Sequence, residues 1–124
     1  MDKFKVVTDS DSFVIEASDI DICNDLIMFV GDSNEIIAVF STDEAKDSIT
    51  YIVSSRDEKQ KTQNKFKVRT KDLGETGYEA TNINIRNNII TLTDNDNKIL
   101  YIFPTKRIRY IIQEGKGEVL NRKY

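Results

Sequence analysis

Basic side chains alternate with other residues along one short segment of the chain. Its four basic residues fall at every second position: Lys65, Lys67, Arg69 and Lys71. Alternate side chains of a β-strand point to the same face, so these four would form a cationic row. Arg107 and Arg109 have the same spacing later in the chain, and Tyr78 or Tyr101 is available to stack on a base. Together these residues predict a phosphate site for a nucleotide or a nucleic acid.

The basic row also has two structural explanations. Lys and Arg on an exposed edge strand protect it against aggregation with other strands. Alternatively, the row meets acidic side chains of the same chain or of a second chain. The sequence leaves these alternatives open.

Residue types that most catalytic and metal sites require are scarce. The 124 residues include no His and one Cys, which excludes a Ser-His-Asp or Cys-His nucleophile and a multi-Cys zinc site. Glu16 and Glu79 are carboxylates in matching contexts, for which we expect a structural role. Residues 94–98 alternate Asp and Asn like the start of a calcium-binding loop. Such a loop needs Gly at position 6 and Glu at position 12, where this chain has Ile99 and Thr105. We therefore expect a protein that is not an enzyme, with no metal and no cofactor.

Acidic and apolar side chains alternate with other residues in the segment 19–30. Asp19 and Asp21 alternate with isoleucines before a turn, and Leu26, Met28 and Val30 alternate after it. Exposed apolar side chains in such a cluster mark an interface, so these five residues predict a protein-binding surface. The sequence equally allows the C-terminal tail or the segment 43–47 to cover the apolar residues.

The elements that would position these residues are present twice. Four segments recur in the same order: 3–8 at 65–70, 16–30 at 79–93, 34–42 at 97–105, and 49–52 at 108–111. So ordered a match indicates an internal duplication. The two copies differ most in charge, because residues 1–58 hold 14 acidic and 4 basic side chains, whereas residues 59–124 hold 7 acidic and 14 basic.

Each copy has the pattern of an antiparallel β-meander. Apolar and polar residues alternate with period two, and Asn24-Asp25 and Asn87-Asn88 separate apolar runs. These two pairs predict hairpins with positive φ at both central residues. The runs 36–40 and 99–103 are apolar on both faces, so we expect both faces of each strand to be covered. The prediction is an all-β protein whose two tandem meander repeats pack as one pseudo-symmetric sandwich or barrel-like domain.

The predicted organisation is a single domain over residues 1–124. Its parts are repeat 1 (2–53), a polar connector (54–64), repeat 2 (65–112) and a C-terminal tail (113–124). A helical turn is expected over 43–47, and the tail either adds an edge strand at Val119-Leu120 or is loose. No export signal and no membrane-length apolar stretch is present, and with free Cys23 this favours a cytoplasmic protein without a membrane partner.

Charge asymmetry between halves points to binding partners. The leading hypothesis is a non-enzymatic binding protein, a protein-interaction or inhibitor factor of the phage or mobile-element type. One alternative is binding of a nucleotide or nucleic acid by the basic face of repeat 2. Another is a self-assembling, virion-like homo-oligomer, in which the acidic half of one chain docks on the basic half of the next.

Overall fold

The chain is built from β-strands. The computed structural model describes residues 2–42, 49–55, 62–71 and 74–117. The strands are β1 (Asp2–Thr8), β2 (Ser12–Ala17), β3 (Asp19–Cys23), β4 (Leu26–Val30), β5 (Ile36–Ser41), β6 (Ile49–Ser55), β7 (Asn64–Thr70), β8 (Gly74–Ala80), β9 (Asn82–Arg86), β10 (Ile89–Thr93), β11 (Ile99–Pro104) and β12 (Ile108–Gln113). A single-turn 3-10 helix, η1 (Thr105–Arg107), precedes β12, and the described residues include no α-helix. The all-β prediction is therefore confirmed.

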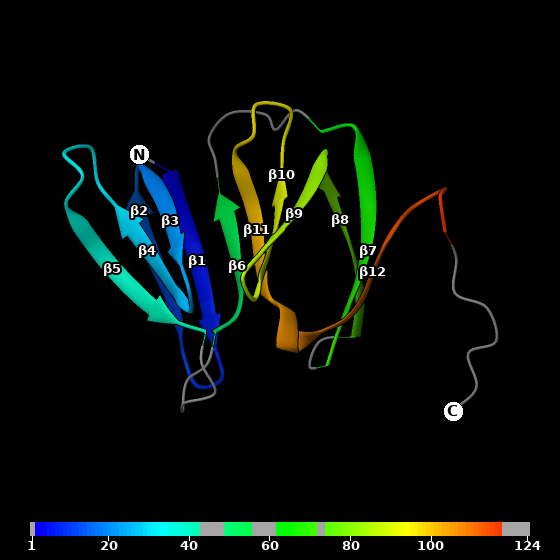
Figure 1. Ribbon diagram of the computed structural model, residues 1–124, viewed down its shortest axis with the longest axis horizontal. Coiled ribbons are helices and arrows are strands. Elements are labelled where there is room, and N and C mark those ends of the chain that lie inside the picture. The colour runs from blue at the N-terminus through cyan, green and yellow to red at the C-terminus, as the bar shows by residue number, and fades with distance from the viewer. Residues whose placement is uncertain (1, 43–48, 56–61, 72–73, 118–124) are drawn as a thin grey trace.

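The strands form three antiparallel sheets. One has six strands in the order β2-β1-β6-β11-β10-β9, and two have three strands each, β12-β7-β8 and β3-β4-β5. All three are open in the described part of the chain, so the barrel-like alternative is wrong. The strands β5 and β12 lie toward opposite ends of the molecule's long axis (Figure 1). A pseudo-symmetric packing of two repeats stays a prediction.

The six-stranded sheet joins the two halves of the chain. Its strands β2, β1 and β6 precede the connector, and β11, β10 and β9 follow it. The junction is the antiparallel pairing of β6 with β11, in which Val53 lies opposite Tyr101 and Ile52 opposite Ile102. The β3-β4-β5 sheet belongs entirely to the first half, and the β12-β7-β8 sheet to the second.

Two apolar clusters form the core. The first contains Phe4, Ile27 and Phe29 of the first half, and also Ile89 and Ile102 of the second. The second cluster contains mainly residues of the second half: Phe66, Val68, Ala80, Leu92, Leu100 and Phe103. Because the first cluster draws on both halves, the six-stranded sheet and the β3-β4-β5 sheet share one core.

The two predicted hairpin turns have the expected length but a different backbone. Asn24 and Asn87 have φ of 52° and 56°, whereas their following residues do not have positive φ. The expectation of positive φ at both central residues is therefore wrong. Asparagine tolerates this left-handed conformation because its short polar side chain bonds to the local backbone. Two further asparagines, Asn34 and Asn97, adopt it in the next turns, with φ of 64° and 61°.

Two strands extend into the predicted polar connector. β6 continues to Ser55, beyond the predicted end of repeat 1, and β7 begins at Asn64. The strand pairings of Ser54 and Ser55 with β1 explain the longer strand. The predicted helical turn at 43–47 and the edge strand at Val119-Leu120 lie outside the described residues.

The first core cluster yields a test of the fold. Phe29 is fully buried, and its ring centroid lies 5.4 Å from that of Phe4 and 5.8 Å from that of Phe40. We expect Phe29→Ala to lower the free energy of unfolding by about 3–5 kcal/mol, because burial is lost and a cavity remains. Val14→Ala, at a side chain that is 70% exposed, should change it by less than about 0.5 kcal/mol. Urea denaturation measures both, and equal effects would contradict this core assignment.

Candidate functional site

One face of the β3-β4-β5 sheet brings together the five residues predicted for a protein interface. In antiparallel strands, directly opposite residues lie on the same face of the sheet. Asp19 lies opposite Val30, and Asp21 lies opposite Met28. Leu26 lies opposite Cys23, and Cys23 is two residues after Asp21 on β3, so both Cys23 and Leu26 are on this same face. We call this surface the outer face. Its acidic residues come from β3 and its apolar residues from β4.

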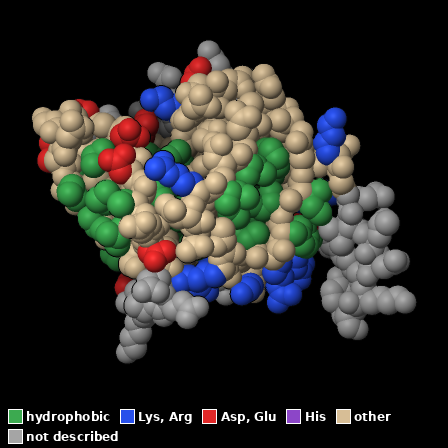
Figure 2. Space-filling view, viewed as in Figure 1, with side chains coloured by type: hydrophobic (Ala, Val, Ile, Leu, Met, Phe, Trp, Pro, Cys, Tyr) green, Lys and Arg blue, Asp and Glu red, His purple; other side chains and the backbone are tan. Residues whose placement is uncertain are grey.

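Strand β5 extends the outer face with further apolar side chains. Val39 lies opposite Met28 and is 46% exposed, while Ile37 and Leu26 are each 42% exposed. No described residue pairs with the outer edge of β5. Figure 2 shows hydrophobic side chains gathered at the β5 end of the molecule, with acidic side chains beside them.

Exposure of β5 corrects one expectation from the sequence. The runs 36–40 and 99–103 were both expected to be covered on both faces. This holds for β11, whose Leu100 and Ile102 are fully buried, but not for β5. The physical reason is that Ile102 packs in the first core cluster and Leu100 in the second, whereas Ile37 and Val39 belong to neither cluster.

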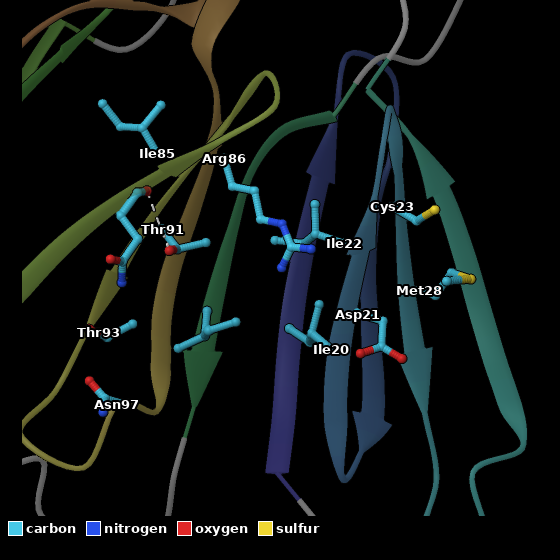
Figure 3. Close-up of a pocket in the computed structure, with 12 residues that line it drawn as sticks. Ile20, Asp21, Ile22, Cys23, Met28, Ile85, Arg86, Thr91, Thr93 and Asn97 are labelled. Atoms are coloured by element: carbon cyan, nitrogen blue, oxygen red, sulfur yellow. Dashed lines mark hydrogen bonds between the residues drawn. The ribbon is translucent and has the colours of Figure 1, made fainter.

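A cleft of about 730 Å³ borders the outer face. It lies between β3 and the strands β9 and β10, and Asp21 and Met28 belong to both the cleft and the outer face (Figure 3). Ile22 and Thr91 contribute apolar and hydroxyl groups to its walls, and Arg86 extends from β9 across it toward β3. The cleft therefore presents both charges and apolar surface to solvent.

The predicted basic row lies on one face of the β12-β7-β8 sheet. Lys65 and Arg69 lie opposite Glu79 and Glu75 of β8, and Lys67 lies opposite Gly77. Exposed Lys71 follows the end of β7. Acidic side chains therefore stand directly beside two of the three basic residues of the strand, which weakens the positive field at this surface.

The two later arginines occupy different positions. Arg107 belongs to η1, and its guanidinium donates hydrogen bonds of 2.7 and 2.8 Å to both carboxylate oxygens of Asp9. This ion pair, in which a single guanidinium nitrogen (Nη2) donates both bonds, connects the β1–β2 loop to the segment before β12. Arg109 is exposed on β12, where the pairing register with β7 shifts between Ile108 and Tyr110.

Of the two tyrosines predicted to stack on a base, Tyr78 lies on the other face of this sheet from the basic row, and Tyr101 of β11 packs against it. Tyr78 is opposite Phe66, which faces the core, and its ring centroid is 4.6 Å from that of Tyr101 and 5.4 Å from that of Phe103. Burial raises the pKa of the Tyr78 and Tyr101 hydroxyls above 10. The structure therefore does not bring these rings together with the row of basic side chains.

Three further carboxylates, Glu16, Glu79 and Asp94, lie beside basic side chains or backbone donors. Glu16 forms an ion pair of 3.8 Å with Lys3, and Glu79 occupies the corresponding position opposite Lys65. The Asp94 carboxylate accepts hydrogen bonds from the backbone N–H groups of Asp96 and Lys98, at 2.8 and 3.0 Å. No group of three or more potential metal ligands occurs within the described ranges.

Comparisons with known proteins identify no relative of this chain. No family model matches the chain, and neither a curated protein nor a solved structure matches it. Within the part of the chain that the structure describes, no helix has the length and apolar character needed to cross a membrane.

The paired tyrosines predict weaker folding at alkaline pH. An unfolded tyrosine ionises near pH 10, while Tyr78 and Tyr101 in the folded chain hold their protons to higher pH. Their contribution to stability is therefore complete below about pH 10 and is lost as pH rises through the folded-state pKa. We expect the urea midpoint to fall less between pH 8 and about pH 11 in the Tyr78→Phe, Tyr101→Phe double variant than in the native chain.

Val14→Ala is the control, because it removes no titratable group. It should keep the pH dependence of the native chain. Identical alkaline losses in the native chain and the double variant would contradict the assignment.

Proposed function

We propose that the protein is a non-enzymatic binding protein, which engages another protein chain through the outer face and the free edge of β5. An unpaired strand edge offers backbone N–H and C=O groups to an added strand. The apolar side chains of β4 and β5 supply surface to be buried, and the acidic residues of β3 favour a basic partner.

The contrast between β5 and β11 is the observation that carries this proposal. These strands occupy corresponding segments of the duplicated sequence. Leu100 and Ile102 of β11 are fully buried, while Ile37 and Val39 at the corresponding positions are 42% and 46% exposed. A strand with the composition of a covered strand, left uncovered in the single chain, fits a surface that a partner buries.

Strand registers support the view that the two copies are equivalent units. Within residues 2–55 the pairings are β1 with β2, β1 with β6, β3 with β4 and β4 with β5. Their counterparts are β7 with β8, β7 with β12, β9 with β10 and β10 with β11. Lys3 lies opposite Glu16 in the same way as Lys65 lies opposite Glu79. Register shifts also occur in corresponding strand pairs, in β1–β6 and β7–β12 and in β4–β5 and β10–β11.

The nucleotide or nucleic-acid alternative has less support. Arg107 is paired with Asp9, two glutamates border the basic row, and the Tyr78 ring lies on the opposite face. A phosphate ligand would have to displace or overcome these groups. The inhibitor role of phage or mobile-element type and the cytoplasmic compartment stay predictions from the sequence.

Capture experiments with matched variants test the proposed binding. Immobilised native chain should retain a protein from a lysate of the source cells, and Val39→Lys should weaken that binding about tenfold or more, because the partner would bury a charge. Val14→Lys, at a 70% exposed position on β2, should bind like the native chain. Both substitutions leave a long side chain able to reach water, so circular dichroism and urea midpoints should match.

Retention of a partner by Val39→Lys with unchanged affinity would contradict the proposal. So would turnover of a substrate that survives repeated purification and disappears on a single substitution. A second copy of the chain counts as a partner in this experiment.

A further inference from the structure

Two of the free strand edges have no counterpart in the other half of the chain. The described residues leave six edges, at β2, β9, β12, β8, β3 and β5. Four of them correspond in pairs, β2 with β8 and β3 with β9, and are edges in both halves. The edges of β5 and β12 differ, because their counterparts β11 and β6 pair with each other.

We infer that β12 of one chain adds to the free edge of β5 of a second copy, antiparallel and in the register of the β6–β11 junction. The inference rests on the proposed function and names its partner. In this register Val39 lies opposite Ile111 of the second copy, and Ala38 lies opposite Ile112. This contact between two chains would have the same strand pairing as the β6–β11 junction within one chain.

Burial in β12 supports this pairing. In the junction strand β6, Ile49 and Ile52 are buried, at 0% and 1% exposure. Ile108 and Ile111, at the corresponding positions of β12, are only half-buried. Both β5 and β12 are therefore more exposed than their counterparts, which pair with each other.

The residues of the inferred contact are apolar at the positions that pair in the junction. Within the chain, Tyr101 of β11 lies opposite Val53 of β6. The smaller Ala38 takes the place of Tyr101 on β5, and the larger Ile112 takes the place of Val53 on β12. The pair Ala38–Ile112 is therefore smaller than Tyr101–Val53, and both of its members are apolar.

Charge and geometry favour a head-to-tail arrangement. β5 belongs to the half with 14 acidic and 4 basic side chains, and β12 to the half with 7 acidic and 14 basic. Pairing β5 with β12 therefore places unlike charges together and strengthens association at low salt. Because the two strands lie toward opposite ends of the molecule (Figure 1), each chain can bind a neighbour at each end. Contacts of this type build rings or filaments.

Cysteine pairing between different chains tests the register. All samples carry Cys23→Ser, because Cys23 is an exposed thiol. One mixture combines Val39→Cys with a mass-tagged Ile111→Cys chain, and another combines Ala38→Cys with Ile112→Cys. Mild oxidation should give mixed disulfide dimers in at least one mixture, since opposite residues in antiparallel strands bring their Cβ atoms close enough.

The matched control mixes Val14→Cys, on the free edge of β2, with Ile111→Cys. Its yield of mixed dimer should be lower by about tenfold, which corresponds to about 1.4 kcal/mol of preference for β5. An equal yield from β2 and β5 would overturn the inferred register.

Light scattering on the Cys23→Ser chain gives a measurement without cross-links. We expect a mass above the 14.3 kDa of one chain, rising with concentration and falling with added salt. Val39→Lys and Ile111→Lys should each reduce it, while Val14→Lys should not. A native chain that stays monomeric at about 1 mM would overturn the inference.

Failure of this inference differs from failure of the proposed function. A monomeric chain that still captures a different protein through Val39 rejects the second copy and leaves the proposed function in place. If the chain is monomeric and associates only after residues 118–124 are removed, these residues block β12. This outcome also rejects pairing between chains that retain them.

Discussion

The pairing of β6 with β11 is the contact on which the rest of the structure depends. It is the strand pairing that joins the two halves in the described part of the chain, and it extends over two opposite residue pairs, Ile52–Ile102 and Val53–Tyr101. Such a short ladder contributes few backbone hydrogen bonds. The apolar cluster on one face, where Ile89 and Ile102 pack with Phe4 and Phe29, supplies the larger part of the cohesion.

This junction also determines which surfaces of the molecule are exposed. Beside β6, β11 places Ile102 in the first core cluster, whereas the similar strand β5 leaves Val39 exposed. The difference in exposure between Val39 and Ile102 therefore results from position in the fold and not from residue type. The described part of one chain contains a single junction of this kind, which β11 occupies. β5 therefore has no strand in the position that β6 takes beside β11.

Local features of the fold could be predicted from the sequence because they depend on near neighbours. Alternation in residues 19–30 was enough to predict that Asp21 and Met28 share a face with Leu26, since a hairpin of two-residue turn fixes the register. The backbone of the turn at Asn24 was predicted less well, because asparagine is compatible with several turn types.

Long-range features could not be predicted in the same way. Nothing in the alternation of residues 36–40 shows that β5 would lack the neighbour that β11 has. The ion pair of Arg107 with Asp9 joins residues 98 positions apart, and no local pattern indicates it. The position of Tyr78 on the core face follows from its pairing with Phe66, which requires knowledge of how the loop before β8 sets the register.

The placement of β5 and β12 at opposite ends of the long axis has a consequence for any array built through them. The two ends of such an array would be chemically different, one finishing in the apolar strand β5 and the other in β12, which carries Arg109. Adding a chain at either end nevertheless forms the same contact between β5 and β12, so the free energy of addition is equal at the two ends. A fragment carrying only one of the two edges would act as a cap, because it can join the array but offers no site for the next chain.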